Sequence, residues 1–160
     1  MQLLKSGIIS DIFIFMMKSF LFPIAFLFVI FCSTIVWAER LAVSSPIANI
    51  RSGPGLKYDI LWKVGKYYPL LVVEKSGEWV HFRDFEGDEG WINRSLLSNI
   101  PTVITKSQKC NIRSSPGTSS NVLITIGKGI PFKIIKQEGD WLNIQHADGD
   151  KGWIHKSLVW

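Results

Sequence analysis

The sequence predicts an all-β protein that contains two tandem copies of one small domain. Three observations support this prediction: a duplication, short β-branched runs, and no clear helical period after residue 40. Residues 41–98 align with residues 103–160 without a gap, at an offset of 62, and 20 of the 58 aligned positions are identical. A repeat of this kind indicates two copies of one structural unit, with residues 99–102 as the linker between them.

The first 38 residues differ in composition from the rest of the chain. They contain seven of the ten phenylalanines, and residues 19–38 carry no charge. Basic residues followed by an apolar run are typical of a signal peptide, here cleaved after Ala38, and Met17 is an alternative start. The alternative is an uncleaved membrane anchor, since about 20 apolar residues can span a bilayer. Both interpretations place residues 39–160 in the periplasm or cell envelope, with membrane contact only if the leader is uncleaved.

Within each unit, the strands are predicted from local patterns. Residues 69–74 and their copy 131–136 are rich in β-branched and apolar residues, which is typical of strands. In the next segment apolar and polar residues alternate, so that Val80 and Phe82 share one face and Trp79 lies on the other. We expect about five short strands in each unit.

A turn follows this alternating strand in both copies. Residues 84–88 and 146–150 are rich in Asp and Gly, and the next strand begins at Gly90 or Gly152. A unit of 58 residues is near the lower limit for a stable core. Closing its sheet into a small barrel leaves few open edges. The expected core residues are Val72, Val80, Phe82 and Ile92, with their copies Ile134, Leu142, Ile144 and Ile154.

The motifs shared by the two units resemble those of bacterial SH3-like (SH3b) domains. They are Asn-Ile-Arg-Ser-x-Pro-Gly, Gly-x-Trp, and Gly-Trp-Ile with a closing Ser-Leu, beginning at Asn49, Gly77 and Gly90 in the first copy. The resemblance implies two tandem SH3-like β-barrels in an exported protein that binds peptidoglycan or its peptides. Two such units and a leader fill the chain, so it implies a stand-alone binding module without a wall hydrolase domain or a cofactor.

Four tryptophans are candidate ligand-binding residues. Trp79 and Trp141 lie on the strand face opposite the expected core, where a flat ring can stack on a sugar or hold a peptide side chain. The alternative is that both rings pack under a loop or against the other unit. Trp91 and Trp153, in the two Gly-Trp-Ile strands, are candidates for the same role or for a structural one.

Two arginines at equivalent positions complete the candidate site. Arg51 and Arg113 precede the Ser-x-Pro-Gly loop of each unit. A guanidinium there either braces the loop through carbonyl hydrogen bonds or holds a ligand carboxylate with two hydrogen bonds.

We predict neither a catalytic nor a metal site. Cys110 aligns with Ala48, which favours packing over chemistry, and a Cys110-dependent hydrolase is the remote alternative. The three histidines occupy no equivalent positions in the two repeats. A metal site built on the common scaffold would require equivalent positions.

The charge distribution bears on the partners. Residues 39–100 carry eight basic and eight acidic residues, whereas residues 101–160 carry eight basic and four acidic residues. A basic second unit favours anionic partners such as wall polymers, while export argues against nucleic acid. The sequence therefore predicts an exported, non-enzymatic module that binds peptidoglycan or an envelope protein. A periplasmic protein-interaction or scaffold module is the alternative.

Overall fold

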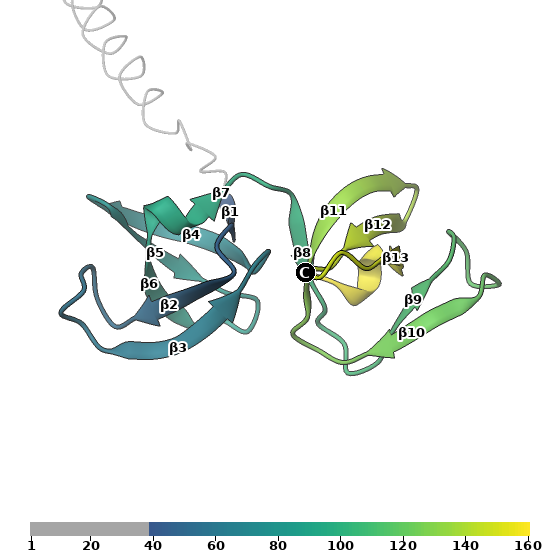
Figure 1. Ribbon diagram of the computed structural model, residues 1–160, viewed down its shortest axis with the longest axis horizontal. Coiled ribbons are helices and arrows are strands. Elements are labelled where there is room, and N and C mark those ends of the chain that lie inside the picture. Colours follow the sequence, from purple (N-terminus) through teal and green to yellow (C-terminus); the bar gives the residue numbers. More distant parts are fainter. Residues whose placement is uncertain (1–38) are drawn as a thin grey trace, which may run out of the picture. The chain divides into compact units, whose positions relative to one another are not determined.

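The computed structural model describes residues 39–160, so the predicted signal peptide lies outside the described residues. Residues 39–160 lie in one compact unit. Within the described part of the chain, the regular elements are strands and two short 3-10 helices, which confirms the all-β prediction (Figure 1). None of its helices is long and apolar enough to cross a membrane.

Repeat 1 forms one antiparallel sheet. Its elements are β1 (Arg40–Val43), β2 (Ile47–Arg51), β3 (Ile60–Gly65), β4 (Pro69–Ser76), β5 (Trp79–Arg83), β6 (Glu89–Asn93), the 3-10 helix η1 (Arg94–Leu96) and β7 (Leu97–Ser98). The strand order is β3-β2-β6-β5-β4-β1-β7. The chain thus makes a meander from β4 to β6 and closes it with strands from both ends of the repeat.

Repeat 2 reproduces this topology. Its elements are β8 (Thr102–Ile104), β9 (Cys110–Arg113), β10 (Val122–Ile126), β11 (Pro131–Glu138), β12 (Trp141–Gln145), β13 (Lys151–His155) and η2 (Lys156–Leu158). The order is β10-β9-β13-β12-β11-β8. An isolated bridge between Thr105 and Val159 lies at the positions equivalent to Val43 and Leu97, which pair between β1 and β7 in repeat 1.

The number of strands exceeds the five predicted for each unit, since the sheets have seven and six strands. The additional strands are β1, β7 and β8, which contain four, two and three residues. Segments this short show no alternation, and they become strands only because neighbouring backbone supplies hydrogen-bond partners.

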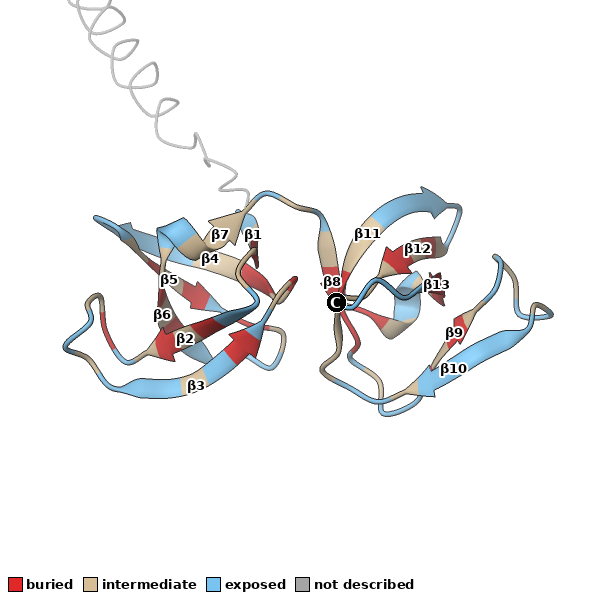
Figure 2. Cartoon of the chain, viewed as in Figure 1, coloured by how far each residue is buried: buried red, intermediate tan, exposed pale blue. Residues whose placement is uncertain are grey.

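Each sheet encloses its own core, as the buried segments in Figure 2 show. Inward side chains from β1 to β6 meet in one cluster in repeat 1, so the sheet must curve around it. The cluster includes the predicted residues Val80, Phe82 and Ile92, and Val72 packs against it. In repeat 2 the predicted Leu142, Ile144 and Ile154 are buried, and Ile134 packs against them.

Equivalent irregularities curve the two sheets. The register between β4 and β5 shifts around Val73, and that between β11 and β12 shifts around Ile135. A residue inserted in this way bends its strand and increases the local twist. Both inserted side chains are exposed.

Candidate binding sites

The outward face of β5 and β6 carries the aromatic residues predicted for repeat 1. Trp79 lies opposite Asn93, and His81 lies opposite Trp91. The rings of His81 and Trp91 stack with their centroids 4.9 Å apart and their planes 16° apart. Since Val80 and Phe82 are buried, the predicted alternation of this strand is confirmed.

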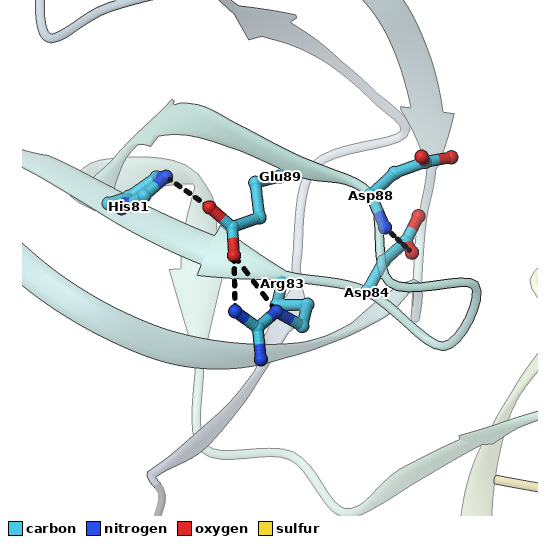
Figure 3. A network of polar contacts seen from close by, with 5 residues as sticks. All are labelled: His81, Arg83, Asp84, Asp88 and Glu89. Carbon is cyan, nitrogen blue, oxygen red and sulfur yellow. Dashed lines mark hydrogen bonds and ion pairs between the residues drawn. The ribbon is translucent and has the colours of Figure 1, made fainter.

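A polar network holds this face in place (Figure 3). Glu89 lies between two side chains of β5, with its Oε2 3.3 Å from His81 Nε2 and its Oε1 2.9 Å from Arg83 Nε. The His81 ring is therefore fixed from one side by Glu89 and from its face by Trp91. The result is an ordered surface with half-buried tryptophans.

Repeat 2 keeps the aromatic residues and changes their surroundings. Trp141 lies opposite His155, and the two rings meet edge to face at 5.3 Å. The ammonium of Lys136 lies 5.0 Å from the centre of the Trp153 ring, whose residue is only 7% exposed. In the described structure, Trp79, Trp91 and Trp141 thus offer more surface to a ligand than Trp153 does. The ligand-binding role of all four stays a prediction.

The two arginines brace loops. Arg51 Nη1 donates hydrogen bonds to the carbonyl oxygens of Leu56 (3.1 Å) and Tyr58 (2.7 Å). Arg113 Nη1 donates to the carbonyl oxygen of Ser120 at 2.6 Å. These bonds are those of the bracing interpretation, and a role for either guanidinium in binding a carboxylate stays a prediction.

Cys110 lies in the core of repeat 2. It is 0% exposed, and its Sγ lies 3.4 Å from the carbonyl oxygen of Ser107. Burial raises the pKa of the thiol. A buried, protonated thiol is a poor nucleophile, so the surroundings of Cys110 favour packing.

Sequence analysis missed one cavity, a groove in repeat 2. It has a volume of about 680 Å³, within the range typical of ligand sites. Its walls are apolar side chains of β9 to β12 and the segment before β11, and its rim is polar. We call it the repeat 2 groove; its walls include Ile112, Leu123, Ile124, Ile126, Ile130, Phe132 and Ile144, and its rim His146, Asp148, Asp150 and Lys151.

The hairpin strand β10 leaves this groove open. Leu123 and Ile124 are 57% and 55% exposed, and β10 is exposed along most of its length in Figure 2. Ile124 pairs with the inward residue Ile112, and both side chains line the groove. Exposed branched apolar residues beside a cavity indicate a surface that a partner can cover.

Repeat 1 fills the corresponding space with its own side chain. Trp62 is the counterpart of Ile124 and pairs with Ile50 as Ile124 pairs with Ile112. The Trp62 ring meets Phe82 edge to face at 6.4 Å and packs against the core. Its tip also lies beside Gly90, 3.3 Å from where a Cβ would stand.

A second difference lies at the end of the groove. In repeat 1 the Tyr68 hydroxyl donates a hydrogen bond to Asp84 Oδ2 at 2.7 Å, and Asp84 Oδ1 accepts from the backbone N–H groups of Glu86 and Asp88. The last of these bonds is drawn in Figure 3. Burial and this hydrogen bond raise the pKa of Tyr68 far above its usual range.

Repeat 2 has Ile130 and His146 in place of that tyrosine and aspartate. His146 lies against Phe132, with ring centroids 5.5 Å apart, and its Nδ1 is 2.9 Å from Asp148 Oδ2. The backbone N–H of Asp150 and the His146 side chain lower the pKa of Asp148. An anionic rim therefore replaces the tyrosine-aspartate closure of repeat 1.

A signal for the groove was present in the aligned sequences. The two repeats differ at three positions whose side chains close the space in repeat 1: Trp62 becomes Ile124, Tyr68 becomes Ile130, and Asp84 becomes His146. Each change alone resembles ordinary drift. Only the fold shows that the three positions border one cavity, because they lie on different segments of the chain.

Comparison with known proteins shows which family this architecture belongs to. Residues 44–99 and 106–160 each match the family model described as bacterial SH3 domain, and together they make up more than half of the chain. A Bacillus subtilis protein named "Putative N-acetylmuramoyl-L-alanine amidase YrvJ" is 28% identical over 146 residues, covering 83% of this chain and 28% of the relative. A Staphylococcus epidermidis protein named "Probable cell wall amidase LytH" is 36% identical over 52 residues, covering 32% of this chain and 18% of the relative.

The curated relatives are longer than the matched region, and the solved structures are distant. The chain spans less than a third of the length of these two amidases. A Bacillus cereus NlpC/P60 family protein has a TM-score of 0.37 and 12% identity, covering 76% of this chain and 56% of its own. NlpC2 from Trichomonas vaginalis has a TM-score of 0.35 and 14% identity, covering 78% of this chain and 48% of its own. With two matched segments and an all-β architecture that repeats itself, the chain belongs to the bacterial SH3 domain family.

Proposed function

We propose that the protein is an exported, non-enzymatic module that binds peptidoglycan in the cell envelope. The observation that carries the proposal is an outward aromatic surface repeated in both domains. Trp79 and Trp141 occupy the same register position. A histidine lies next to each of them on the neighbouring pairs of the sheet, since His81 pairs with Trp91 beside Trp79, and His155 pairs with Trp141 itself. The similarity to proteins named as amidases, one of them a cell wall amidase, supports the proposed location in the cell envelope.

The chemistry of this surface suits a wall polymer. A half-buried indole offers a face for the apolar side of a sugar ring or a peptide methyl group. The net positive charge of residues 101–160 favours an anionic surface. Two weak sites on one chain raise the overall affinity when both engage the same polymer.

The test is retention of residues 39–160 on purified sacculi. We expect the wild-type chain to sediment with the sacculi and the Trp79→Ala/Trp141→Ala double variant to lose most of its retention. The matched control is Val73→Ala/Ile135→Ala, which truncates exposed apolar residues at equivalent strand positions. Retention of the wild type no better than that of an unrelated protein of similar charge would refute wall binding.

The non-enzymatic part of the proposal has its own measurement. Sacculi incubated with the chain should release no soluble muropeptides, and Cys110→Ala should leave retention unchanged. Release of muropeptides that disappears in Cys110→Ala would establish the hydrolase alternative instead.

A protein-interaction module is the second candidate function, and the repeat 2 groove favours it. An apolar groove with a charged rim is a common form of peptide-binding site. Crosslinking in cells followed by purification should then yield one polypeptide partner in stoichiometric amount, whereas recovery of wall fragments alone would argue for the first function.

A further inference from the structure

The repeat 2 groove carries an inference that does not depend on wall binding. Its counterpart in repeat 1 shows what kind of group fits there, because the two repeats share register and topology. Trp62 packs against Phe82 and lies beside Gly90. The residues of repeat 2 equivalent to Phe82 and Gly90 are Ile144 and Gly152, and both line the open groove. In repeat 2, Leu123 lies beside Gly152 where the tip of Trp62 lies beside Gly90, and the groove next to Ile124 and Ile144 stays open.

The groove also keeps the apolar contacts that an aromatic ring requires. Ile112, Ile144 and Phe132 form its floor and belong to the core cluster of repeat 2. Leu123 reaches across Gly152 from β10, with its Cδ1 3.5 Å from where a glycine Cβ would stand. A planar group that enters the groove beside β10 would thus contact apolar side chains of β10 and of the core cluster.

The rim adds a preference of charge. Four titratable side chains border the groove: His146, Asp148, Asp150 and Lys151. His146 is paired with Asp148, whereas no ion pair within residues 39–160 involves Asp150. With two carboxylates against one lysine, the rim is anionic and complements a cationic neighbour of the inserted ring.

We propose that the repeat 2 groove binds a polypeptide partner that inserts an aromatic side chain where Trp62 lies in repeat 1, with a lysine or arginine beside it facing Asp148 and Asp150. Repeat 1 closes this site with its own tryptophan, so the two copies of the domain differ in function. In repeat 1 the site is filled by Trp62, and in repeat 2 it is open to a partner.

The experiment uses three dipeptide probes and residues 39–160 labelled with ¹⁵N. Acetyl-Trp-Lys-amide should perturb the backbone amide signals of β10 and of residues 146–152 in a saturable manner. Acetyl-Ala-Lys-amide should leave those signals unchanged, and acetyl-Trp-Glu-amide should bind several-fold more weakly. Equal binding of the alanine probe would overturn the aromatic occupant, and equal binding of the glutamate probe would overturn the charge preference.

Two reciprocal substitutions test whether Trp62 of repeat 1 marks the position that the partner's aromatic side chain takes in repeat 2. Ile124→Trp gives repeat 2 the residue that repeat 1 already carries, so we expect it to fold and to weaken acetyl-Trp-Lys-amide binding at least tenfold. Trp62→Ile should open a second site and add perturbed amides on β3. Undiminished binding by a folded Ile124→Trp variant would overturn the proposal, as would the absence of any perturbation at millimolar probe.

Peptidoglycan is the competing ligand for the repeat 2 groove, and the same spectra distinguish it from a polypeptide partner. Soluble muropeptides that perturb the groove amides, when acetyl-Trp-Lys-amide does not, would assign the groove to peptidoglycan and overturn the polypeptide partner. We expect sacculus retention to survive in Ile124→Trp, because the proposed wall-binding residues Trp79 and Trp141 do not line the groove.

Discussion

Single side chains decide how completely each copy of the domain encloses its core. Trp62 and Ile124 occupy the same register position, yet the first packs on Phe82 and the second is exposed. Replacing an indole by a smaller side chain removes contacts that the surrounding sheet does not recover, because strands cannot collapse by several ångströms without breaking their pairing. The groove is therefore a consequence of composition at a few positions within a conserved topology.

Cys110 should behave as a packing residue. Since its thiol is buried and its pKa is raised, we expect native chain to react with a thiol reagent roughly a hundredfold more slowly than chain unfolded in urea. Cys110→Ala should lower the free energy of unfolding by about 1 kcal/mol, since alanine occupies the equivalent position in repeat 1. Rapid labelling of the native chain would contradict the packing role.

Gly152 is required by close packing against β9. A Cβ at this position would overlap Ile112 Cγ2 and approach the Arg113 carbonyl oxygen at 3.2 Å. Gly152→Ala should therefore lower the free energy of unfolding by about 1–3 kcal/mol in urea denaturation. Gly127→Ala is the control, because its nearest such contact is the Gln108 carbonyl oxygen at 3.9 Å, and an equal loss in both variants would argue against steric overlap.

At the scale of elements, the loops depend on side chains from the adjacent strands. The loop after β2 closes with a hydrogen bond from the Ser52 N–H to the Asp59 carbonyl oxygen, and Arg51 crosses it to bind two further carbonyl groups. Such bonds order a segment that has little apolar burial of its own. The conformation of this loop thus depends on Arg51, the last residue of the strand that precedes it.

Removing this brace should loosen the loop without unfolding the sheet. A charged hydrogen bond contributes about 1.5–3 kcal/mol, so Arg51→Met should speed amide hydrogen exchange at Ser52 and Tyr58 at least tenfold. Exchange in β5 should stay unchanged and serves as the internal control. Unchanged exchange at Ser52 would show that the brace adds nothing to the order of the loop.

The Tyr68–Asp84 bond predicts a pH dependence specific to repeat 1. The folded pKa of Tyr68 is raised above its ordinary value of 10.0 by burial and by Asp84. Its contribution to stability is therefore complete below pH 10 and declines above it, as the unfolded tyrosine ionises more readily than the folded one. Urea denaturation should show wild-type stability falling more steeply between pH 10 and 11 than that of Tyr68→Phe.

The same variant provides a control at neutral pH. Tyr68→Phe should cost about 1 kcal/mol at pH 7, because Asp84 loses one partner and retains its two backbone donors. Tyr58 and Tyr67 are present in both chains, so their ionisation cancels in the comparison. Parallel stability curves above pH 10 would contradict the predicted linkage.

At the scale of the whole molecule, the described chain has two hydrophobic clusters without a shared member. One draws on residues 43–92 and the other on residues 103–159. Each sheet also pairs only with strands of its own repeat. Stability should therefore be divided between the repeats, and unfolding need not be a single cooperative event.

Matched core truncations test this division. Ile154→Ala should lower the stability of repeat 2 by about 2–5 kcal/mol, and Ile92→Ala should do the same to repeat 1. Both side chains are 0% exposed and occupy equivalent positions. Hydrogen exchange should accelerate only in the substituted repeat; acceleration throughout residues 39–160 would indicate one cooperative unit.

The sequence alone determined the number of repeats, the strand class and the inward residues, because these depend on local pattern and on the offset of 62. Alternation along residues 79–83 predicts that Val80 and Phe82 face the core, and both are buried. It did not locate the groove: whether Leu123 and Ile124 are covered depends on residues far away in the chain. Tertiary structure decided that point, since burial is set by what packs opposite a strand, and periodicity along one strand carries no information about the volume of its neighbours.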